Sequence, residues 1–370
     1  MNSIRMAVLA SLWVTGLVSV SSWVGSPGYL GGETGALIAR ANSWPGSMAA
    51  TGDSITRAFN TGSIQFTDAP TNSWATGSSG LVDSYSSRIA ETNPAMSGRS
   101  YNDAVSGGKM VDLKAQMMVA NRQHVDLVTV LMGGNDACAP TEEAMTQVAT
   151  FRAQFEEALD TLSEGSPDAR VLVLSVPNVK DLWAILHDNS SARAAWSKLG
   201  VCQSMLAHAG SMAKADVERR ARVGQRVIEY NTQLAEVCAM YVQCRFDGGA
   251  VFKTEFAAGD VSTRDYFHPS VGGQAKLADV VYAAGFDFSD RTPATSRVAA
   301  QETDGEGTLK LRLDVADGAG VAGIEYRIGD EAVARYEGGE VTVRRGTTMM
   351  YRAVDVNGNM EGWHLVSAPK

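Results

Sequence analysis

Short apolar runs alternate along most of the chain with longer segments in which apolar residues recur every three or four positions. The runs are typical of strands buried on both faces of a sheet, and they lie at 47–52, 125–132 and 170–176, with a last short strand expected within 245–252. The periodic segments predict helices at 81–91, 111–124, 141–162 and 273–284, with further helices between 177 and 240. This alternation predicts an α/β domain whose parallel sheet is covered by helices on both faces.

A different pattern follows Asp290. Apolar and polar residues alternate one by one, as in Leu309, Leu311 and Leu313, and turn dipeptides such as Asn357-Gly358 separate the runs. We therefore expect residues 46–290 to form the α/β domain and 291–370 to form a small all-β domain, an Ig-like sandwich. This second domain shows no catalytic constellation, so the sequence leaves two roles open, a structural cap or an accessory binding or spacing module.

The N-terminus has the pattern of an export signal. Arg5 precedes an apolar run over 6–24, so residues 1–25 are interpreted as a signal peptide whose cleavage site is unresolved. Residues 26–45 are rich in Gly and Ser and are interpreted as a linker. We expect a secreted protein with no stable membrane insertion after cleavage; the alternative is an uncleaved N-terminal membrane anchor, because the run approaches spanning length.

Charge and cysteine content narrow the possible partners and the compartment. A net charge of -9 disfavours nucleic acid as a partner and gives no attraction to anionic membranes. An exported protein meets oxidising conditions, in which an even number of cysteines is expected to form disulfides. The four cysteines can pair in three ways; they are Cys138, Cys202, Cys238 and Cys244. The short spacing favours Cys238–Cys244, which leaves Cys138–Cys202; four free thiols are the alternative. No spacing is typical of a zinc site.

Candidate chemistry lies where the predicted strands end. Ser54 follows the first strand at a point where a helix is expected to begin, and Asn135 follows a later buried strand. Asp265 precedes His268 by three residues, a spacing at which a carboxylate in a tight turn accepts a hydrogen bond from the imidazole. Gly107 offers an exposed backbone N–H within a glycine pair. Each motif alone also fits a plain capping, turn or surface role.

Together the motifs resemble the four conserved blocks of the SGNH, or GDSL-type, hydrolases over about residues 46–285. The matching stretches, in chain order, are Gly52-Asp53-Ser54, Ser106-Gly107, Gly133-Gly134-Asn135-Asp136 and Asp265-x-x-His268. The stretch 73–77 also resembles the phospholipase B-like branch. The resemblance implies a flavodoxin-like three-layer α/β/α domain with a central parallel sheet; the β domain lies outside it.

By the same resemblance, Ser54 is the nucleophile, His268 the base and Asp265 its orienting partner. The backbone N–H groups of Ser54 and Gly107 and the Asn135 side chain form the oxyanion hole, with Gly108 as the alternative to Gly107. The implied activity is that of a carboxylic ester hydrolase of lipase or esterase type, acting on a small-molecule or lipid acyl ester, with no cofactor and no metal.

Two alternatives stay open at this point. One is a polysaccharide O-deacetylase that uses the same triad. The other is a non-catalytic surface- or carbohydrate-binding protein with a vestigial hydrolase fold. The acyl chain, the alcohol or headgroup and the oligomeric state do not follow from the sequence.

Overall fold

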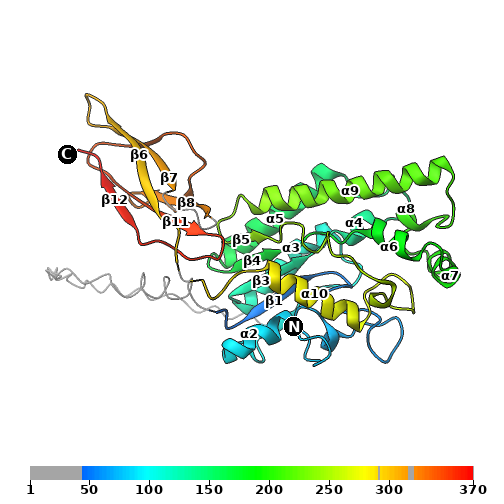
Figure 1. Ribbon diagram of the computed structural model, residues 1–370. Helices are drawn as coiled ribbons and strands as arrows, with labels where there is room; N and C mark the ends of the chain where they lie inside the picture. The colour runs from blue at the N-terminus through cyan, green and yellow to red at the C-terminus, as the bar shows by residue number, and fades with distance from the viewer. Residues whose placement is uncertain (1–43, 291, 316–320, 370) are drawn as a thin grey trace, which may run out of the picture.

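A five-stranded parallel sheet forms the centre of the larger part of the molecule, as the alternating pattern predicts (Figure 1). The computed structural model describes residues 44–290, 292–315 and 321–369, so the predicted signal peptide and nearly all of the predicted linker lie outside the described residues. The strands are β1 (Met48–Gly52), β2 (Ser100–Asn102), β3 (Leu127–Leu131), β4 (Arg170–Val173) and β5 (Cys244–Phe246). Their order, β2-β1-β3-β4-β5, is that of a flavodoxin-like sheet, which confirms the expected fold class.

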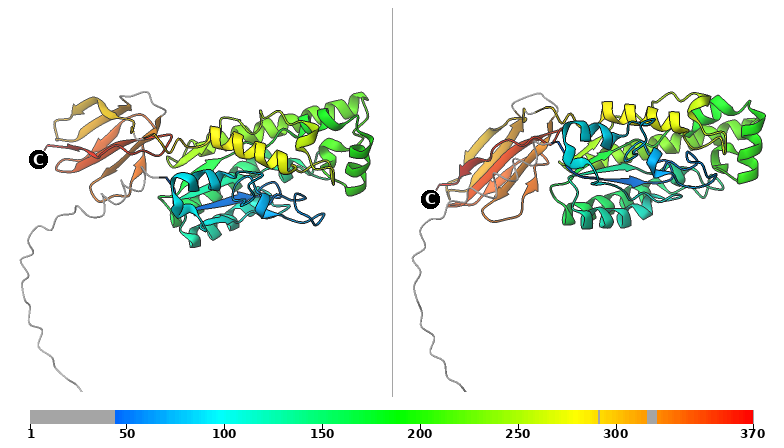
Figure 2. Two further views of the ribbon diagram at one scale, coloured as in Figure 1. Left: turned by 60° about the horizontal axis from the view of Figure 1, so that its bottom comes forward. Right: turned by 90° about the horizontal axis from the view of Figure 1, so that it is seen from below.

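Two apolar clusters show which helices cover which face of this sheet. One face packs against α3 (Met110–Gln123), α5 (Val148–Gly165) and α9 (Lys214–Cys238). The other face packs against α2 (Tyr85–Thr92) and α10 (Val271–Ala284). Every residue of β1 and β3 is buried, because helices cover the sheet on both sides (Figure 2).

Shorter helices gather at the end of the sheet where the strands have their carboxyl ends. They are α4 (Gly134–Ala137), α6 (Val179–Leu186), α7 (Ser190–Leu199) and α8 (Gln203–Leu206). A third apolar cluster, which includes Leu186, Trp196 and Met205, holds them together. Single 3₁₀ turns occur at η1 (Pro70–Asn72), η2 (Pro94–Met96) and η3 (Ala258–Asp260). Within the described part of the chain, no helix is both long and apolar enough to cross a membrane.

Three local expectations were wrong. No helix begins at Ser54: residues 54–60 form successive turns, and the positive φ angles of Ala58 and Asn60 stop a helix from propagating. The helix expected from Thr141 begins only at Val148, because the Thr146 hydroxyl and N–H bond to Asp136 and hold the preceding segment in turns. Trp74, in a stretch interpreted as a surface loop, is fully buried against the α2 and α10 side of the sheet.

The C-terminal residues form two antiparallel sheets around one apolar core. One sheet contains β6 (Ser296–Thr303), β7 (Leu309–Val315) and β10 (Val341–Val343). The other contains β8 (Val321–Ile328), β9 (Ala334–Arg335), β11 (Thr348–Asp355) and β12 (His364–Ser367). Their apolar residues form a single cluster, which is the sandwich arrangement expected from period-two alternation. The boundary between 290 and 291 stays a prediction.

One turn of the sandwich meets the α/β domain. The Asn357 amide oxygen accepts from Arg245 Nη1 at 2.8 Å and from the Asp287 N–H at 3.0 Å, and its amide nitrogen donates to Asp290 at 2.8 Å. Arg245 lies in β5, and Gly358 packs against Arg170, the first residue of β4. The sandwich therefore sits near the amino ends of the strands, away from α6, α7 and α8 (Figures 1 and 2).

Both disulfides have the pairing that the sequence favours. Cys138–Cys202 joins the end of α4 to the start of α8, and Cys238–Cys244 joins the end of α9 to β5. The first lies in the cluster under α6–α8, and the second lies beside the main helical face of the sheet.

Candidate active site

The turn that carries Ser54 is fixed by the end of strand β1. Gly52 has φ +142°, and a side chain there would collide with the Leu131 carbonyl of β3, so only glycine fits. The buried Gln116 of α3 holds the same residue from both sides: it accepts from the Gly52 N–H at 2.7 Å and donates to the Gly52 carbonyl at 2.9 Å. These contacts set the direction in which the chain leaves the sheet and places Ser54.

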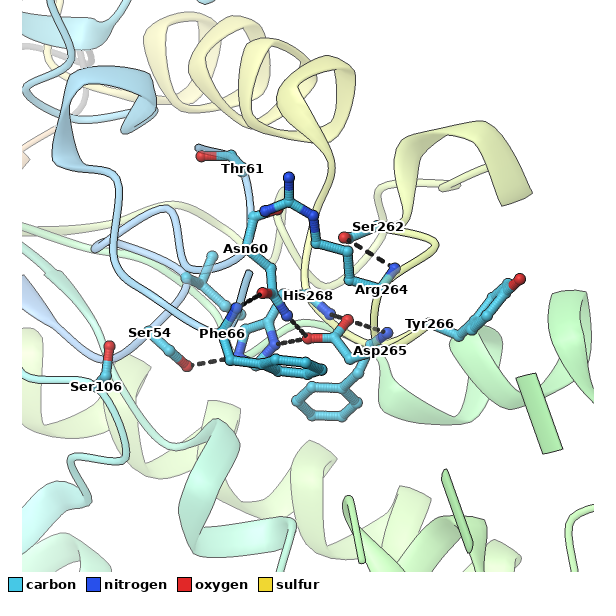
Figure 3. Close-up of polar contacts among 12 residues, drawn as sticks. Ser54, Asn60, Thr61, Phe66, Ser106, Ser262, Arg264, Asp265, Tyr266 and His268 are labelled. Atoms are coloured by element: carbon cyan, nitrogen blue, oxygen red, sulfur yellow. Dashed lines mark hydrogen bonds and ion pairs between the residues drawn. The ribbon is translucent and has the colours of Figure 1, made fainter. Parts of the chain in front are cut away.

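The serine, histidine and aspartate singled out in the sequence lie in one hydrogen-bonded line. Ser54 Oγ is 2.8 Å from His268 Nε2, and His268 Nδ1 is 2.7 Å from Asp265 Oδ2 (Figure 3). The rings of Phe59 and Phe267 flank the imidazole, with centroids 4.8 and 5.1 Å from its own. The imidazole is therefore held in a plane that points one nitrogen at the hydroxyl and the other at the carboxylate.

Asp265 is built to stay ionised. Burial opposes its charge, but the His268 side chain and the backbone N–H groups of Phe267 and His268 donate to it and together lower its pKa. The left-handed backbone at Tyr266, φ +55°, turns the chain back so that both N–H groups face one carboxylate oxygen. The other oxygen accepts from the imidazole Nδ1 and from the Asn60 side chain.

Hydrogen-bond donors converge near Ser54. Among the described residues, the N–H groups of Ser54 and Gly107 donate to no other group, whereas the Gly108 N–H is used by the Val105 carbonyl at 2.9 Å. Asn135 donates one amide hydrogen to the Gly108 carbonyl at 2.9 Å, and its second points loosely toward Asp53 at 3.5 Å. Of the two glycines, Gly107 is thus the one with a free donor.

A buried acid lies beneath this group of donors. Asp53 is almost inaccessible, and desolvation raises its pKa to about 6, although the Ile55 N–H and the nearby His268 act in the opposite direction. The buried Asp136 carboxylate also contributes to the increase. The site therefore holds a carboxyl group whose ionisation is costly.

An apolar cavity is lined by chain neighbours of the serine and the histidine, although these two residues do not themselves line it. Its wall includes Ile55, Gly134 and Pro269, the chain neighbours of Ser54, Asn135 and His268. The rest of the wall is mainly aliphatic and aromatic and includes Ala137, Val176, Val179, Leu182, Ile185, Val227, Phe256, Val261, Phe267 and Leu277. The cavity runs from the turn of Ser54 toward α6 and fits an apolar group better than a polar one.

Two residues in contact with this site were missed in the sequence. Asn60 donates to Asp265, and Arg264 donates to backbone carbonyls of the loop that follows Asn60 (Figure 3). An asparagine six residues after a serine, or an arginine beside an aspartate, forms no recognisable pattern. Neither residue could be found before the fold brought the two segments together. Among the described residues, no group of three or more His, Cys, Asp or Glu side chains could hold a metal ion.

Comparison with solved structures finds matches to several hydrolases at low sequence identity. The extracellular lipase of Streptomyces rimosus is 20% identical, with a TM-score of 0.41, and the match covers 65% of this chain and 99% of the lipase. Phospholipase A1 of Streptomyces albidoflavus is 17% identical, with a TM-score of 0.39, over 65% of this chain and all of that enzyme. A family two carbohydrate esterase of Clostridium thermocellum is 12% identical, with a TM-score of 0.35, over 64% and 62% of the two chains.

Comparison with curated proteins finds no match. The family model of the GDSL-like lipases and acylhydrolases, in contrast, matches residues 48–281, which is most of the α/β domain and more than half of the chain. The chain therefore belongs to the GDSL-like lipase/acylhydrolase family, the SGNH hydrolases that its motifs resemble.

Proposed function

We propose that this protein is a secreted serine hydrolase that cleaves carboxylic acyl esters through an acyl-enzyme on Ser54. The observation that carries the proposal is the continuous line from Ser54 Oγ through His268 to Asp265, with contacts of 2.8 and 2.7 Å. A hydroxyl, an imidazole and an ionised carboxylate in this order are the parts that nucleophilic acyl transfer needs. Membership of a lipase and acylhydrolase family supports the same class of reaction.

In the first half of the reaction, His268 Nε2 takes the Ser54 proton as Oγ adds to the ester carbonyl carbon. The oxyanion accepts from the Ser54 and Gly107 N–H groups and from the Asn135 amide hydrogen that points toward Asp53 at 3.5 Å in the free protein. The tetrahedral intermediate then collapses: the bond to the alcohol oxygen breaks as His268 returns the proton to it. Water, activated by the same imidazole, releases the acid in the second half.

The apolar cavity favours an acyl group longer than acetyl. One part of its wall is formed by Ile55, Gly134 and Pro269, the chain neighbours of Ser54, Asn135 and His268. Another part is formed by the apolar side chains of α6. Each methylene that enters such a cavity gains about 0.8 kcal/mol from leaving water. A polysaccharide O-deacetylase would need no cavity of this kind, and the intact hydrogen-bonded line disfavours a non-catalytic binding protein.

Export remains part of the proposal, supported by the two disulfides together with the apolar N-terminal sequence. Culture fractionation followed by N-terminal sequencing of the mature protein tests it. A mature chain that starts between about residues 20 and 46 in the medium is expected; an intact Met1 in the membrane fraction would favour the anchor.

The enzymatic part is tested with p-nitrophenyl esters from acetate to decanoate, beside a phospholipid and acetylated xylan. We expect hydrolysis of the p-nitrophenyl esters with an optimum beyond acetate, together with labelling of Ser54 by a fluorophosphonate. Ser54→Ala should abolish both turnover and labelling. A folded Ser54→Ala variant with wild-type turnover would refute the assignment.

A further inference from the structure

Asn60 joins the active-site carboxylate to a neighbouring surface loop. Its side chain is almost completely buried, and its Nδ2 lies 2.5 Å from Asp265 Oδ2, the oxygen that also accepts from His268 Nδ1 (Figure 3). Its Oδ1 accepts from the Phe66 N–H at 2.6 Å. The amide orientation follows from the chemistry, because a backbone N–H only donates and an ionised carboxylate only accepts.

We propose that Asn60 is a positioning residue for ester hydrolysis, which holds the Asp265 carboxylate in the orientation that His268 requires. This inference rests on the proposed function. Asp265 Oδ1 is fixed by two backbone N–H groups, whereas the donors to Oδ2 among the described residues are the imidazole and Asn60. A donor on the far side of Oδ2 resists rotation of the carboxylate away from His268, and a hydrogen bond to an ionised acceptor is stronger than one between neutral groups.

The backbone around Asn60 is arranged to deliver this donor. Its φ of +67° is a left-handed conformation that asparagine tolerates better than most residues, and its N–H donates to the Thr67 carbonyl at 2.9 Å. The segment 60–67 is therefore a closed loop, with the Asn60 side chain as its inner anchor through Phe66. Rotation of the side chain away from Asp265 would therefore also break its bond to the Phe66 N–H.

Arg264 fixes the same loop from the other segment of the site. Its guanidinium donates to the carbonyls of Asn60, at 3.1 Å, and of Gly62 and Ile64, at 2.6 and 3.2 Å. Because Arg264 is the chain neighbour of Asp265, the loop and the carboxylate are held together by both residues. The arrangement fixes the relative positions of two segments about two hundred residues apart in sequence.

Two substitutions separate the roles of the Asn60 amide. Asn60→Asp keeps the size, the tolerance of positive φ and the acceptor for the Phe66 N–H, but replaces the donor by a carboxyl oxygen. Asn60→Gly suits the backbone even better and removes the whole amide, so it stays informative if the first variant does not fold. At pH 8 we expect both to lower kcat by ~10–100-fold on a short p-nitrophenyl ester, with KM changed by less than about twofold.

Asn72→Asp is the matched control. Asn72 is a half-buried asparagine that likewise bonds to this loop, donating at 3.2 Å to the carbonyl and the hydroxyl of Thr61, and it has no bond to Asp265. The same chemical change there should leave kcat within about threefold of wild type. Thermal unfolding of all variants separates a loss of folded protein from a loss of turnover.

A double-mutant cycle provides the decisive readout. If Asn60 acts through the carboxylate, Asn60→Gly should cost less than about threefold in an Asp265→Asn background, although it costs far more in the wild type. Folded Asn60 variants with wild-type kcat, or losses that simply multiply in the double variant, would overturn the inference. Failure of the proposed function looks different: the wild-type protein would neither hydrolyse esters nor be labelled at Ser54.

Discussion

The described side chains of the site divide into groups that face the ester and groups that hold them. Ser54 and His268 share the hydrogen bond at the proposed reaction centre, whereas Asp265, with its lowered pKa, and Asn60 lie behind the imidazole. Asp265 supplies a negative charge and Asn60 helps to hold its orientation. Both lie in buried surroundings, where electrostatic interactions and hydrogen bonds are stronger than in water.

Asn135→Ala tests the side-chain donor of the proposed oxyanion hole. The substitution should lower kcat by ~10²–10³-fold with a smaller change in KM, because the lost hydrogen bond strengthens mainly in the transition state. Steady-state kinetics on p-nitrophenyl butyrate measures this. Asn189→Ala, which removes an N-cap side chain of α7, is the control and should leave kcat unchanged. An unchanged kcat in folded Asn135→Ala would exclude a role for this amide.

Asp53 predicts a pH-dependent cost to stability. Burial raises its pKa from 3.8 to about 6 in the folded protein. Below about pH 4 the carboxyl is neutral in the folded protein and costs no stability, but as the pH rises through 6 it ionises inside the protein and the folded state loses stability. At pH 8 the folded state holds a buried carboxylate at a cost of about 3 kcal/mol. Asp53→Asn should remove this cost, although it also disturbs Asn135.

Urea unfolding at pH 4 and pH 8 measures the effect. The free energy of unfolding of Asp53→Asn minus that of wild type should be larger at pH 8 than at pH 4 by up to about 3 kcal/mol, because the variant gains relative stability as the pH rises. Asp168→Asn, a change at an exposed turn position, should alter both values equally. A difference that is the same at both pH values for Asp53→Asn would contradict the expected titration.

At the scale of elements, the candidate site lies at the carboxyl ends of the parallel strands. Strand β1 ends in the turn of Ser54, β3 ends before Asn135, and α6 contributes part of the wall of the apolar cavity. Parallel strands place their carboxyl ends at one edge, so segments distant in sequence contribute to one site. The short helices around α6 depend on a small cluster and on one disulfide for their position.

Leu182→Trp tests whether α6 lines an acyl site. A larger side chain at this cavity position should occupy the space of the acyl chain, so kcat/KM should fall at least ~10-fold more for p-nitrophenyl octanoate than for acetate. Leu199→Trp, at an exposed position of α7 outside the cavity, is the matched control and should preserve the chain-length profile. Equal losses on all esters would argue that the acyl chain lies elsewhere.

The two disulfides should differ in their contribution to stability. Cys138–Cys202 spans 64 residues and Cys238–Cys244 spans 6, so loop-closure entropy predicts about 4 kcal/mol for the first and about 2 kcal/mol for the second. Replacing each pair by alanines and measuring urea unfolding tests the order. A larger loss for the short-range pair would show that packing, rather than chain entropy, dominates.

At the scale of the whole molecule, the two parts have separate cores. The clusters of the α/β domain include residues up to Phe288, and the cluster of the sandwich begins at Val298. The contact made by Asn357 reaches Arg245, Asp287 and Asp290, near the amino ends of the strands. The sandwich therefore lies at the opposite end of the sheet from Ser54 (Figure 1).

A truncated protein that ends at Asp290 should remain folded and hydrolyse p-nitrophenyl butyrate with a kcat within about twofold of the full chain. It should unfold at a lower temperature, because Arg245 loses its hydrogen bond to Asn357 and the aromatic residues near it become exposed to solvent. Asn357→Ala in the full chain should lower stability without changing kcat. If the truncated protein is folded but inactive, the sandwich contributes to the site and the domain boundary is wrong.

The sequence by itself determined most of the order of elements and the motifs of the candidate site; strand β2 was not predicted, because its three residues form no apolar run. Local rules were sufficient for the parts that were predicted: apolar runs and helical periodicity identified the sheet and its covering helices, and period-two alternation identified the sandwich. Ser54, Asn135, Asp265 and His268 stood in motifs whose spacing is itself informative, and the cysteine spacing favoured the pairing that the structure has.

Only the tertiary structure decided what depends on contacts between distant segments. The chain after Ser54 forms turns rather than a helix because a closed loop, fixed by Arg264 from the other end of the domain, prevails over local propensity. Trp74 is buried by helices that are distant in sequence, and the Asp53 pKa rises because the fold removes water from it. The bond from Asn60 to Asp265 joins positions 205 residues apart, a proximity that no local pattern encodes.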